Sequence, residues 1–171
     1  CRAIQAAHNS VARVLQEELV KAWSKSGQEV QRAWDQAVAA VEWIPRLHEQ
    51  TLAAQKPDGI CHFLEQERVC IIEMARTGDR DILSDNNERK QEKEWKYAAL
   101  TQSISRRMQR QATLVVFIIG IKGTIDEEDW KKNMATLGVT DRRGEIITRV
   151  LQENLKQQHG LFRMRLKQGV G

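Results

Sequence analysis

Residues 114–119, LVVFII, constrain the fold most, because all of them are apolar and no longer apolar run occurs in the 171-residue chain. The run is far shorter than the roughly 20 residues that cross a membrane as a helix. Both of its alternating faces are apolar, which is typical of a strand buried between two layers of structure. Gly120 and Gly123 follow and end it. We therefore predict a buried strand here and no membrane span.

A long charged segment, residues 84–110, precedes this strand and contains neither glycine nor proline. We predict that it forms the longest helix, with Ser84 or Asp85 as its N-cap. Before it, two short apolar runs at residues 60–64 and 69–74 flank a charged tetrad, which predicts a β-hairpin. Strand, helix and buried strand together predict a right-handed parallel crossover.

Other elements follow from apolar spacing and capping residues. Four apolar residues at four-residue spacing predict a helix over residues 11–23: Val11, Leu15, Leu19 and Trp23. Between this helix and the hairpin we predict a second helix after Gly27, which carries Val30, Trp34 and Val38, and an extended piece at residues 41–45. After the buried strand we predict helices at 126–137 (capped by Thr124 or Asp126) and 142–158 (capped by Thr140 or Asp141). A loose basic tail follows from Gly160. The fold class that follows is α/β, a single domain with a small mixed sheet, a long crossover helix and flanking helices.

Charge and cysteine content bear on the partner and the compartment. The chain has 27 Lys and Arg against 23 Asp and Glu, a net charge of +4, which permits a polyanionic partner. Its three cysteines, Cys1, Cys61 and Cys70, form no CxxC pair and favour a reducing intracellular compartment. Cys61 and Cys70 would face each other across the hairpin as small apolar residues. Because the chain begins with Cys1 rather than methionine, we expect it to be part of a longer polypeptide.

Two acidic residues lie at the predicted hairpin. Asp58 follows Pro57 where the first strand begins, and Glu73 ends the second strand after a run of apolar residues. Antiparallel pairing would bring the two carboxylates close together, where like charges raise each other's pKa unless a cation lies between them. Carboxylate oxygens suit Mg²⁺ or Mn²⁺, which keep water ligands for a phosphate substrate. The alternative is that Asp58 caps a turn and Glu73 lies in solvent.

Two lysines extend the apolar stripe of the predicted long helix toward its N-terminus. The stripe consists of Tyr97, Leu100, Ile104 and Met108. At i, i+3, i+4 spacing it continues to Lys96 and Lys93, so both would face the sheet edge that carries the two acids. Alternatively, they extend from the edge of the core into water. Two acids and a lysine around a divalent ion suit phosphodiester hydrolysis, because the ion activates a water and the ammonium stabilises the transition state.

These motifs resemble a known nuclease family. KPD at residues 56–58, Glu73 after 14 intervening residues, and EKEWKY at residues 92–97 resemble the restriction-like endonuclease domain at the C-terminal end of non-LTR retrotransposon reverse-transcriptase proteins. That domain has the PD-(D/E)XK nuclease fold. Ala75 stands where most nucleases of this fold carry lysine, and the retrotransposon branch is similar to this chain in having its lysine on the following helix.

The resemblance extends along most of the chain. HNSV at residues 8–11 resembles the segment after that family's zinc knuckle, with Cys1 as the knuckle's last cysteine. IIEMA at residues 71–75, with Asp79, resembles the strand and loop of the second acid, and residues 115–123 resemble the late apolar strand and its glycine turn. The resemblance implies three parts, namely an N-terminal helix after a truncated knuckle (1–28), an endonuclease core (29–124), and C-terminal helices with a basic tail (125–171).

The function that the resemblance implies is a Mg²⁺- or Mn²⁺-dependent endonuclease that nicks target DNA in the nucleus, so that the cut strand primes reverse transcription. Asp58 and Glu73 would bind the metal, with the backbone carbonyl of Met74, and Lys93 or Lys96 would assist. The implied partners are DNA and the reverse-transcriptase part of the same polypeptide, with no membrane. The alternative is a DNA-binding or scaffold remnant of the same fold that has lost cleavage.

Further residues are candidates for DNA contact. The expected DNA-binding residues are His8, Arg106, Arg107 and Arg110. For the arginines the alternative is a solvated helix end, and for His8 it is packing. His62 lies in the hairpin near the acids, where a lone histidine more often packs or lies at the surface. We predict that Trp95 and Trp130 anchor their helices to the core.

Overall fold

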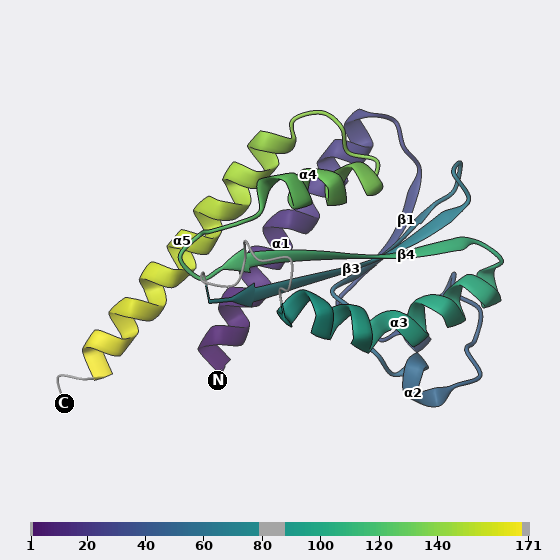
Figure 1. Ribbon diagram of the computed structural model, residues 1–171, viewed down its shortest axis with the longest axis horizontal. Helices are drawn as coiled ribbons and strands as arrows, with labels where there is room; N and C mark the ends of the chain where they lie inside the picture. The colour runs from purple at the N-terminus through teal and green to yellow at the C-terminus, as the bar shows by residue number, and fades with distance from the viewer. Residues whose placement is uncertain (1, 79–87, 169–171) are drawn as a thin grey trace. The chain divides into compact units, whose positions relative to one another are not determined.

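The computed structural model of the protein describes residues 2–78 and 88–168. Its elements follow in the order α1 (Arg2–Lys25), β1 (Val30–Trp34), the 3-10 helix η1 (Val38–Ala40), α2 (Gln50–Ala53), β2 (Gly59–Phe63), β3 (Arg68–Thr77), α3 (Glu88–Met108), β4 (Gln111–Gly120), α4 (Glu127–Thr136) and α5 (Arg143–Gln168) (Figure 1). The predicted α/β class is therefore confirmed. Four residues discussed above lie outside the described residues: Cys1, Asp79, Ser84 and Asp85.

The described strands form a four-stranded sheet in the order β1-β2-β3-β4. β1 is antiparallel to β2, with Val30 opposite Phe63, and β2 is antiparallel to β3, with Gly59 opposite Ile72. β3 and β4 point in the same direction and are connected by α3 (Figure 1). The sheet is therefore mixed, and the predicted hairpin, late strand and parallel crossover are confirmed.

The chain divides into two compact units. The first unit consists of Cys1–Ala22, Ala75–Asn87 and Ile118–Gly171, and the second of Trp23–Met74 and Glu88–Phe117. The first unit thus contains most of α1 together with α4 and α5. The second contains β1, β2 and α3, along with residues 68–74 of β3 and residues 111–117 of β4.

The core of the first unit includes the predicted face of α1. Val11, Leu15 and Leu19 are all buried, as four-residue spacing requires of one helix face, although α1 begins nine residues earlier than predicted. α4 contributes Trp130, which is 1% exposed and whose Nε1 donates to the carbonyl oxygen of Ile118 at 2.7 Å. The prediction that Trp130 anchors its helix is therefore confirmed.

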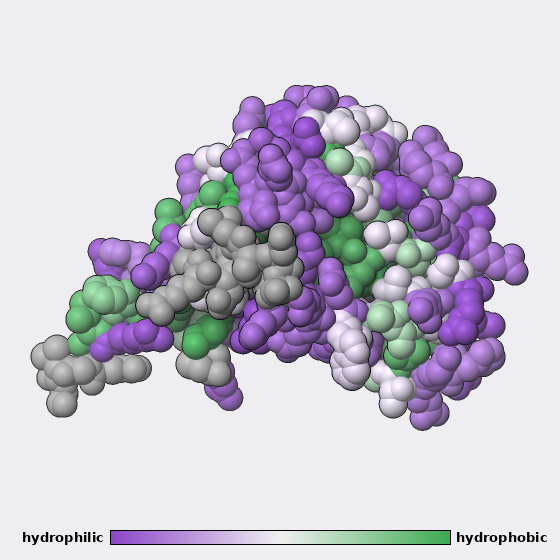
Figure 2. Space-filling model, viewed as in Figure 1, coloured by the Kyte–Doolittle hydropathy of each residue, from purple (hydrophilic) through white to green (hydrophobic). Residues whose placement is uncertain are grey.

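α5 carries one buried polar residue and several exposed apolar ones. Asn154 is fully buried, its Nδ2 donates to the carbonyl oxygen of Gly120 at 3.0 Å, and its Oδ1 accepts from Nε of Arg76 at 3.0 Å. These bonds satisfy an amide that would otherwise be costly to bury. Hydrophobic surface is visible toward the C-terminal end of α5 (Figure 2), where about half of each of these side chains is exposed: Leu155, Phe162, Met164 and Leu166.

The core of the second unit lies between the sheet and α3. α3 contributes Tyr97, Leu100 and Ile104, which are all buried and confirm the predicted stripe. The other members of this core come from the strands and from the segment between β1 and α2, namely Ala33, Ile60, Val69, Ile71, Val38, Val41, Ile44 and Leu47. One face of α3 is therefore fixed against the hairpin that carries Asp58 and Glu73.

The prediction of a second helix after Gly27 is wrong. Val30 and Trp34 have helical spacing, but they are the first and last residues of the five-residue strand β1, with Ala33 buried and Arg32 exposed. Pairing with β2, about 30 residues away in sequence, overrides the local spacing. The extended piece predicted at residues 41–45 is instead a turn, in which the N–H of Ile44 donates to the carbonyl of Val41.

Helix lengths and caps also correct the predictions. α3 has 21 residues and is shorter than α1, with 24, and α5, with 26. The loose tail predicted from Gly160 is wrong because α5 continues to Gln168, and one glycine costs a helix only about 1 kcal/mol. Of the two caps considered for α4, Asp126 is the N-cap, and its side chain accepts from the N–H of Asp129.

Candidate active site

Asp58 and Glu73 lie opposite each other where β2 begins. Asp58 directly precedes β2, and since Gly59 is opposite Ile72, continuing the register by one residue puts Asp58 opposite Glu73. The N–H of Asp58 donates to Oε1 of Glu73 at 2.9 Å, and the N–H of Met74 donates to Oδ2 of Asp58 at 2.7 Å. Each carboxylate is thus oriented by the backbone of the other strand, and the acids lie together as predicted.

The backbone around Asp58 is held by contacts that the sequence analysis did not foresee. A Cβ atom on Gly59 would lie 2.4 Å from the ring of Trp34, so this ring can pack here only against a glycine. The carbonyl of Asp58 accepts from the N–H of Asp35 at 3.0 Å, and the Asp35 carboxylate pairs with Lys56 at 3.2 Å. Only the close packing of Trp34 reveals why residue 59 is glycine.

Lys93 completes the cluster from α3. Its Nζ donates to Oε2 of Glu73 at 2.8 Å. The Glu73 side chain is 3% exposed, whereas that of Lys93 is 25% exposed. The ammonium therefore reaches a buried carboxylate and retains contact with water, and both oxygens of Glu73 accept a hydrogen bond.

Lys96 and Tyr97 occupy different positions around the same cluster. Tyr97, one helical turn after Lys93, is buried, and the charge of Glu73 raises the pKa of its hydroxyl after the larger effect of burial. Lys96 is exposed, and its Nζ lies 4.9 Å from the centre of the Tyr97 ring. The structure thus brings Lys93 to the acids, while Lys96 lies over the tyrosine next to them. Tyr97 is a site residue that the sequence analysis assigned only to the core.

The electrostatics of the cluster favour a cation. Burial raises the pKa of Glu73, the negative charge of Asp58 raises it further, and the hydrogen bond and charge of Lys93 oppose this shift. Burial also raises the pKa of Tyr97 well above its ordinary value, and the negative charges of Glu73 and Asp58 raise it further. Two acids at close range in a poorly hydrated site are stabilised by positive charge.

The donor set fits a small divalent cation. Mg²⁺ is commonly held by one or two carboxylates and keeps several waters, so Asp58 and Glu73 with the carbonyl of Met74 suffice in number and chemistry. Among the described residues no group of three or more His, Cys, Asp and Glu side chains that could hold a metal ion is found. The raised pKa of Glu73 comes first from burial and then from the charge of Asp58, which Lys93 opposes, so a cation at the two carboxylates would favour the ionised form of Glu73.

The predicted DNA-binding residues do not join this cluster. His8 lies half-buried on α1 in the first unit. Lys93 and Arg106 are 13 residues apart on α3, a distance of about 20 Å along the helix axis. Nη1 of Arg107 lies 3.5 Å from Nε2 of His48, and Nη2 of Arg110 pairs with Oε1 of Glu67 at 3.5 Å. The arginines thus lie at the other end of α3.

His62 contacts other side chains of the second unit, and Trp95 is exposed to solvent. Nδ1 of His62 lies 2.9 Å from Oε1 of Gln31, and its ring stacks on Trp43 with centroids 5.8 Å apart. Burial and, to a smaller extent, the charge of Arg110 lower the pKa of His62. Trp95 is 87% exposed, so the prediction that it anchors α3 to the core is wrong.

The cysteines of the hairpin face each other as predicted. Cys61 is opposite Cys70 in the register of β2 and β3, and both are buried free thiols. Burial raises the pKa of both, and that of Cys70 is raised to about 11. They are therefore protonated, apolar core residues at neutral pH.

Comparison with known proteins leaves the function to be argued from these residues. No family model and no curated protein matches the sequence. Within residues 2–78 and 88–168, no helix is long and apolar enough to cross a membrane.

Proposed function

We propose that the chain is the Mg²⁺-dependent DNA endonuclease domain of a retroelement protein, with a fold of the PD-(D/E)XK type. In this proposal Asp58 and Glu73 hold the ion, and Lys93 is the catalytic cation. The observation that carries the proposal is the contact of 2.8 Å between Lys93 on α3 and Glu73 on β3, beside an acid on the neighbouring strand. The strand–helix–strand path through a mixed sheet also supports it.

The proposed division of labour follows from the burial and charge of each group. When bound, Mg²⁺ lowers the pKa of a coordinated water and neutralises the phosphate. Asp58 is held by the N–H of Met74, so its carboxylate direction is fixed before any substrate binds. Lys93, which retains a quarter of its exposure, is the cation that stabilises the negative charge of the transition state. Tyr97 is a positioning residue, since it is buried and close enough to Glu73 for that charge to shift its pKa.

Lys93 is the better candidate than Lys96 for the catalytic cation. Lys93 contacts Glu73 directly, and it lies on the face of α3 that packs on the hairpin. Lys96 is exposed and contacts the ring of Tyr97 rather than a carboxylate. In the proposed reaction Lys96 therefore attracts the DNA phosphates, as a surface cation does.

A second function, a DNA-binding or scaffold protein of the same fold without cleavage, is favoured by one specific observation. Both oxygens of Glu73 already accept hydrogen bonds from the chain, one from Lys93 and one from the backbone of Asp58. A carboxylate satisfied in this way can serve the hairpin alone. The two functions differ in whether a divalent ion stabilises the folded protein.

Thermal melts separate these functions. The parent and Asp58→Asn are melted with and without millimolar Mg²⁺ or Mn²⁺, in the presence of a short DNA duplex. We expect the ion to raise the midpoint of the parent and leave that of Asp58→Asn unchanged, because the variant lacks one metal ligand. Equal midpoints with and without the ion in the parent would favour the non-catalytic protein.

Nicking of supercoiled plasmid tests the assigned lysine. We expect Lys93→Ala to lower the rate at least about 100-fold, the usual effect of losing a group that stabilises transition-state charge. Lys96→Ala is the matched control on the same turn of α3, and its smaller loss should depend on salt concentration. Full activity of Lys93→Ala would remove this lysine from the mechanism.

A further inference from the structure

β1 forms an edge of the sheet, and two hydrogen bonds define which of its residues bond to β2. The N–H of Leu64 donates to the carbonyl of Glu29, and the N–H of Asp35 donates to the carbonyl of Asp58. By the register of β1 and β2, Glu29 is opposite Leu64 and Asp35 is opposite Asp58. Both are therefore hydrogen-bonded pairs of the antiparallel ladder.

The same alternation defines the free edge of β1. Because hydrogen-bonded and non-bonded pairs alternate, Gln31 and Ala33 direct their backbone groups toward β2. Val30, Arg32 and Trp34 therefore direct their N–H and C=O groups away from β2. In the described part of the chain, no strand pairs with this side of β1.

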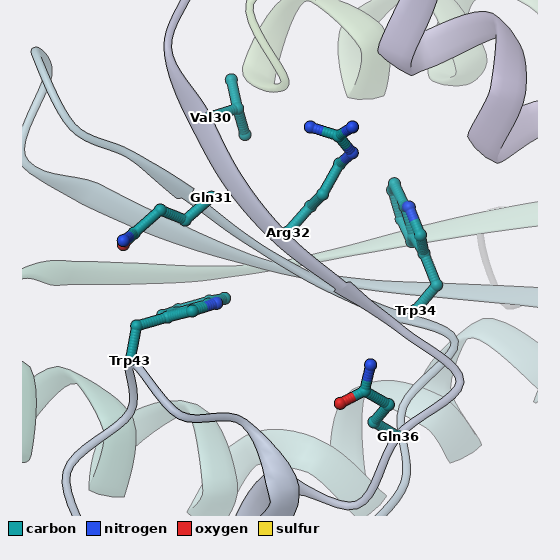
Figure 3. A pocket seen from close by; sticks show the side chains of 6 residues that line it. All are labelled: Val30, Gln31, Arg32, Trp34, Gln36 and Trp43. Carbon is teal, nitrogen blue, oxygen red and sulfur yellow. The ribbon is translucent and has the colours of Figure 1, made fainter.

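A groove of about 510 Å³ follows this edge, within the second unit. It is lined by β1 residues together with Gln36 and Trp43. Figure 3 shows that Arg32 and Trp34 project on one side of the strand and Trp43 lies on the other. Arg32 is exposed, and it forms no ion pair with another described residue. The edge thus combines free backbone groups, two aromatic rings and one cation.

We propose that this edge of β1 binds an extended peptide segment that carries an acidic side chain opposite Arg32. The segment adds a strand to the sheet, and its backbone pairs with Val30, Arg32 and Trp34. A carboxylate opposite Arg32 forms a favourable cross-strand pair, while Trp34 and Trp43 contact its apolar neighbours on either face. The proposal does not depend on the nuclease function, because it uses neither Asp58 nor Glu73.

Two other occupants fit less well. A second copy of the chain, in the antiparallel register that pairs all three outward residues, would put Arg32 opposite its own equivalent, and like charges in this position are destabilising. Single-stranded nucleic acid would stack on tryptophan rings and pair with Arg32. However, phosphates only accept hydrogen bonds, so they cannot satisfy the outward carbonyls, which recur about every 7 Å as in any strand.

The test measures binding of short labelled peptides to the full chain by fluorescence anisotropy. The probe is an acetylated and amidated peptide of alternating valine and threonine with a central glutamate. Its matched controls carry a central lysine, or N-methyl groups on alternate backbone nitrogens. We expect the glutamate peptide to bind and the N-methylated peptide to fail, because the latter cannot donate to the outward carbonyls.

Two variants assign the binding to β1. Arg32→Glu should raise the Kd for the glutamate peptide at least about fivefold and reverse the preference in favour of the lysine peptide. Val30→Pro removes one outward N–H and no hydrogen bond to β2, and proline is tolerated at the first residue of an edge strand. This variant should therefore bind both peptides more weakly. If circular dichroism shows that Val30→Pro does not fold, the N-methylated peptide tests the same contact on the parent.

Three results would overturn the proposal. The first is no saturable binding of the glutamate or the lysine peptide, and the second is equal binding of the N-methylated peptide. The third is binding of an oligothymidine that depends on Arg32 and displaces the peptide, which would assign the groove to nucleic acid.

Discussion

Removing Lys93 should destabilise the protein in a way that depends on pH. In the metal-free protein, Lys93→Met deletes the ammonium that lies 2.8 Å from Glu73 and retains the aliphatic part of the side chain. Glu73 is then a carboxylate that is 3% exposed, with Asp58 close by and without the cation that Lys93 supplies. Breaking one side of a buried ion pair usually costs about 3 to 5 kcal/mol.

The site itself limits this cost. Glu73 can take up a proton, and at pH 7 protonating a carboxyl with the ordinary pKa of 4.5 costs about 3.5 kcal/mol, at about 1.4 kcal/mol per pH unit. Because the pKa of Glu73 is already raised in the parent, we expect Lys93→Met to lose about 2 to 3 kcal/mol at pH 7. Glu73→Gln should lose about 1 kcal/mol or less, because Lys93 is 25% exposed and its ammonium can turn to water.

The pH dependence follows from the direction of the Glu73 shift. A carboxyl whose folded pKa is raised contributes stability that is present below its unfolded pKa and is lost as pH rises through the folded pKa. Lys93→Met raises the folded pKa of Glu73 further, because a charge that lowered it is gone. The deficit of Lys93→Met relative to the parent should therefore shrink as pH falls from 7 toward 4.5.

Urea denaturation followed by tryptophan fluorescence measures these differences, in EDTA at pH 7 and pH 5. The double variant Lys93→Met/Glu73→Gln is the control, and its stability should exceed that of Lys93→Met at pH 7, since no buried charge is left unpaired. The reasoning is refuted if Lys93→Met loses less than about 0.5 kcal/mol at pH 7, a value typical of surface changes. It is also refuted if the deficit is the same at both pH values.

Other regions of the second unit give simpler expectations. Gly59→Ala should lower the free energy of unfolding by about 1 to 3 kcal/mol in thermal melts, because its Cβ would lie 2.4 Å from the Trp34 ring. In a Cys1→Ser background, Cys61 and Cys70 should react with a thiol reagent at pH 8 only after unfolding, since both are buried and the pKa of Cys70 is raised to about 11. Rapid reaction of the native protein would contradict that placement. Trp95→Ala should change stability by less than about 0.5 kcal/mol, as measured by urea denaturation, because the side chain is 87% exposed.

The parts of the fold that could be predicted from sequence are those whose pattern is local. The hairpin of β2 and β3 follows from two apolar runs separated by a short polar segment with three charged residues, and the helix face of Val11, Leu15 and Leu19 follows from their spacing. β1 could not be predicted in this way, because Val30 and Trp34 have helical spacing and the strand exists through pairing with β2. Its five residues are too few to show the period of two clearly.

That the two acids lie close together could be predicted, because a short turn between antiparallel strands brings such residues near each other. Their exact pairing could not, since a turn at residues 65–68 would put Asp58 opposite Ala75, whereas the structure closes the hairpin with residues 64–67 and puts Asp58 opposite Glu73. The hydrogen bonds between them could not be predicted, since they need the backbone of Met74 at 2.7 Å from one carboxylate. Neither could the requirement for Gly59, which comes from the Trp34 ring on β1, a strand missed in the sequence.

Helical geometry alone indicates which of the two lysines faces the acids. At 100° per residue, Lys93 lies 40° around α3 from Tyr97, whereas Lys96 lies 100° away, so only Lys93 shares the buried face closely. The structure agrees, since Lys93 contacts Glu73 and Lys96 is exposed. Tyr97 lies on the same face, and the charges of Glu73 and Asp58 contribute to its raised pKa after burial. Polar atoms at the end of an apolar stripe are therefore the sequence feature by which this kind of site, a buried carboxylate met by a helix, can be recognised.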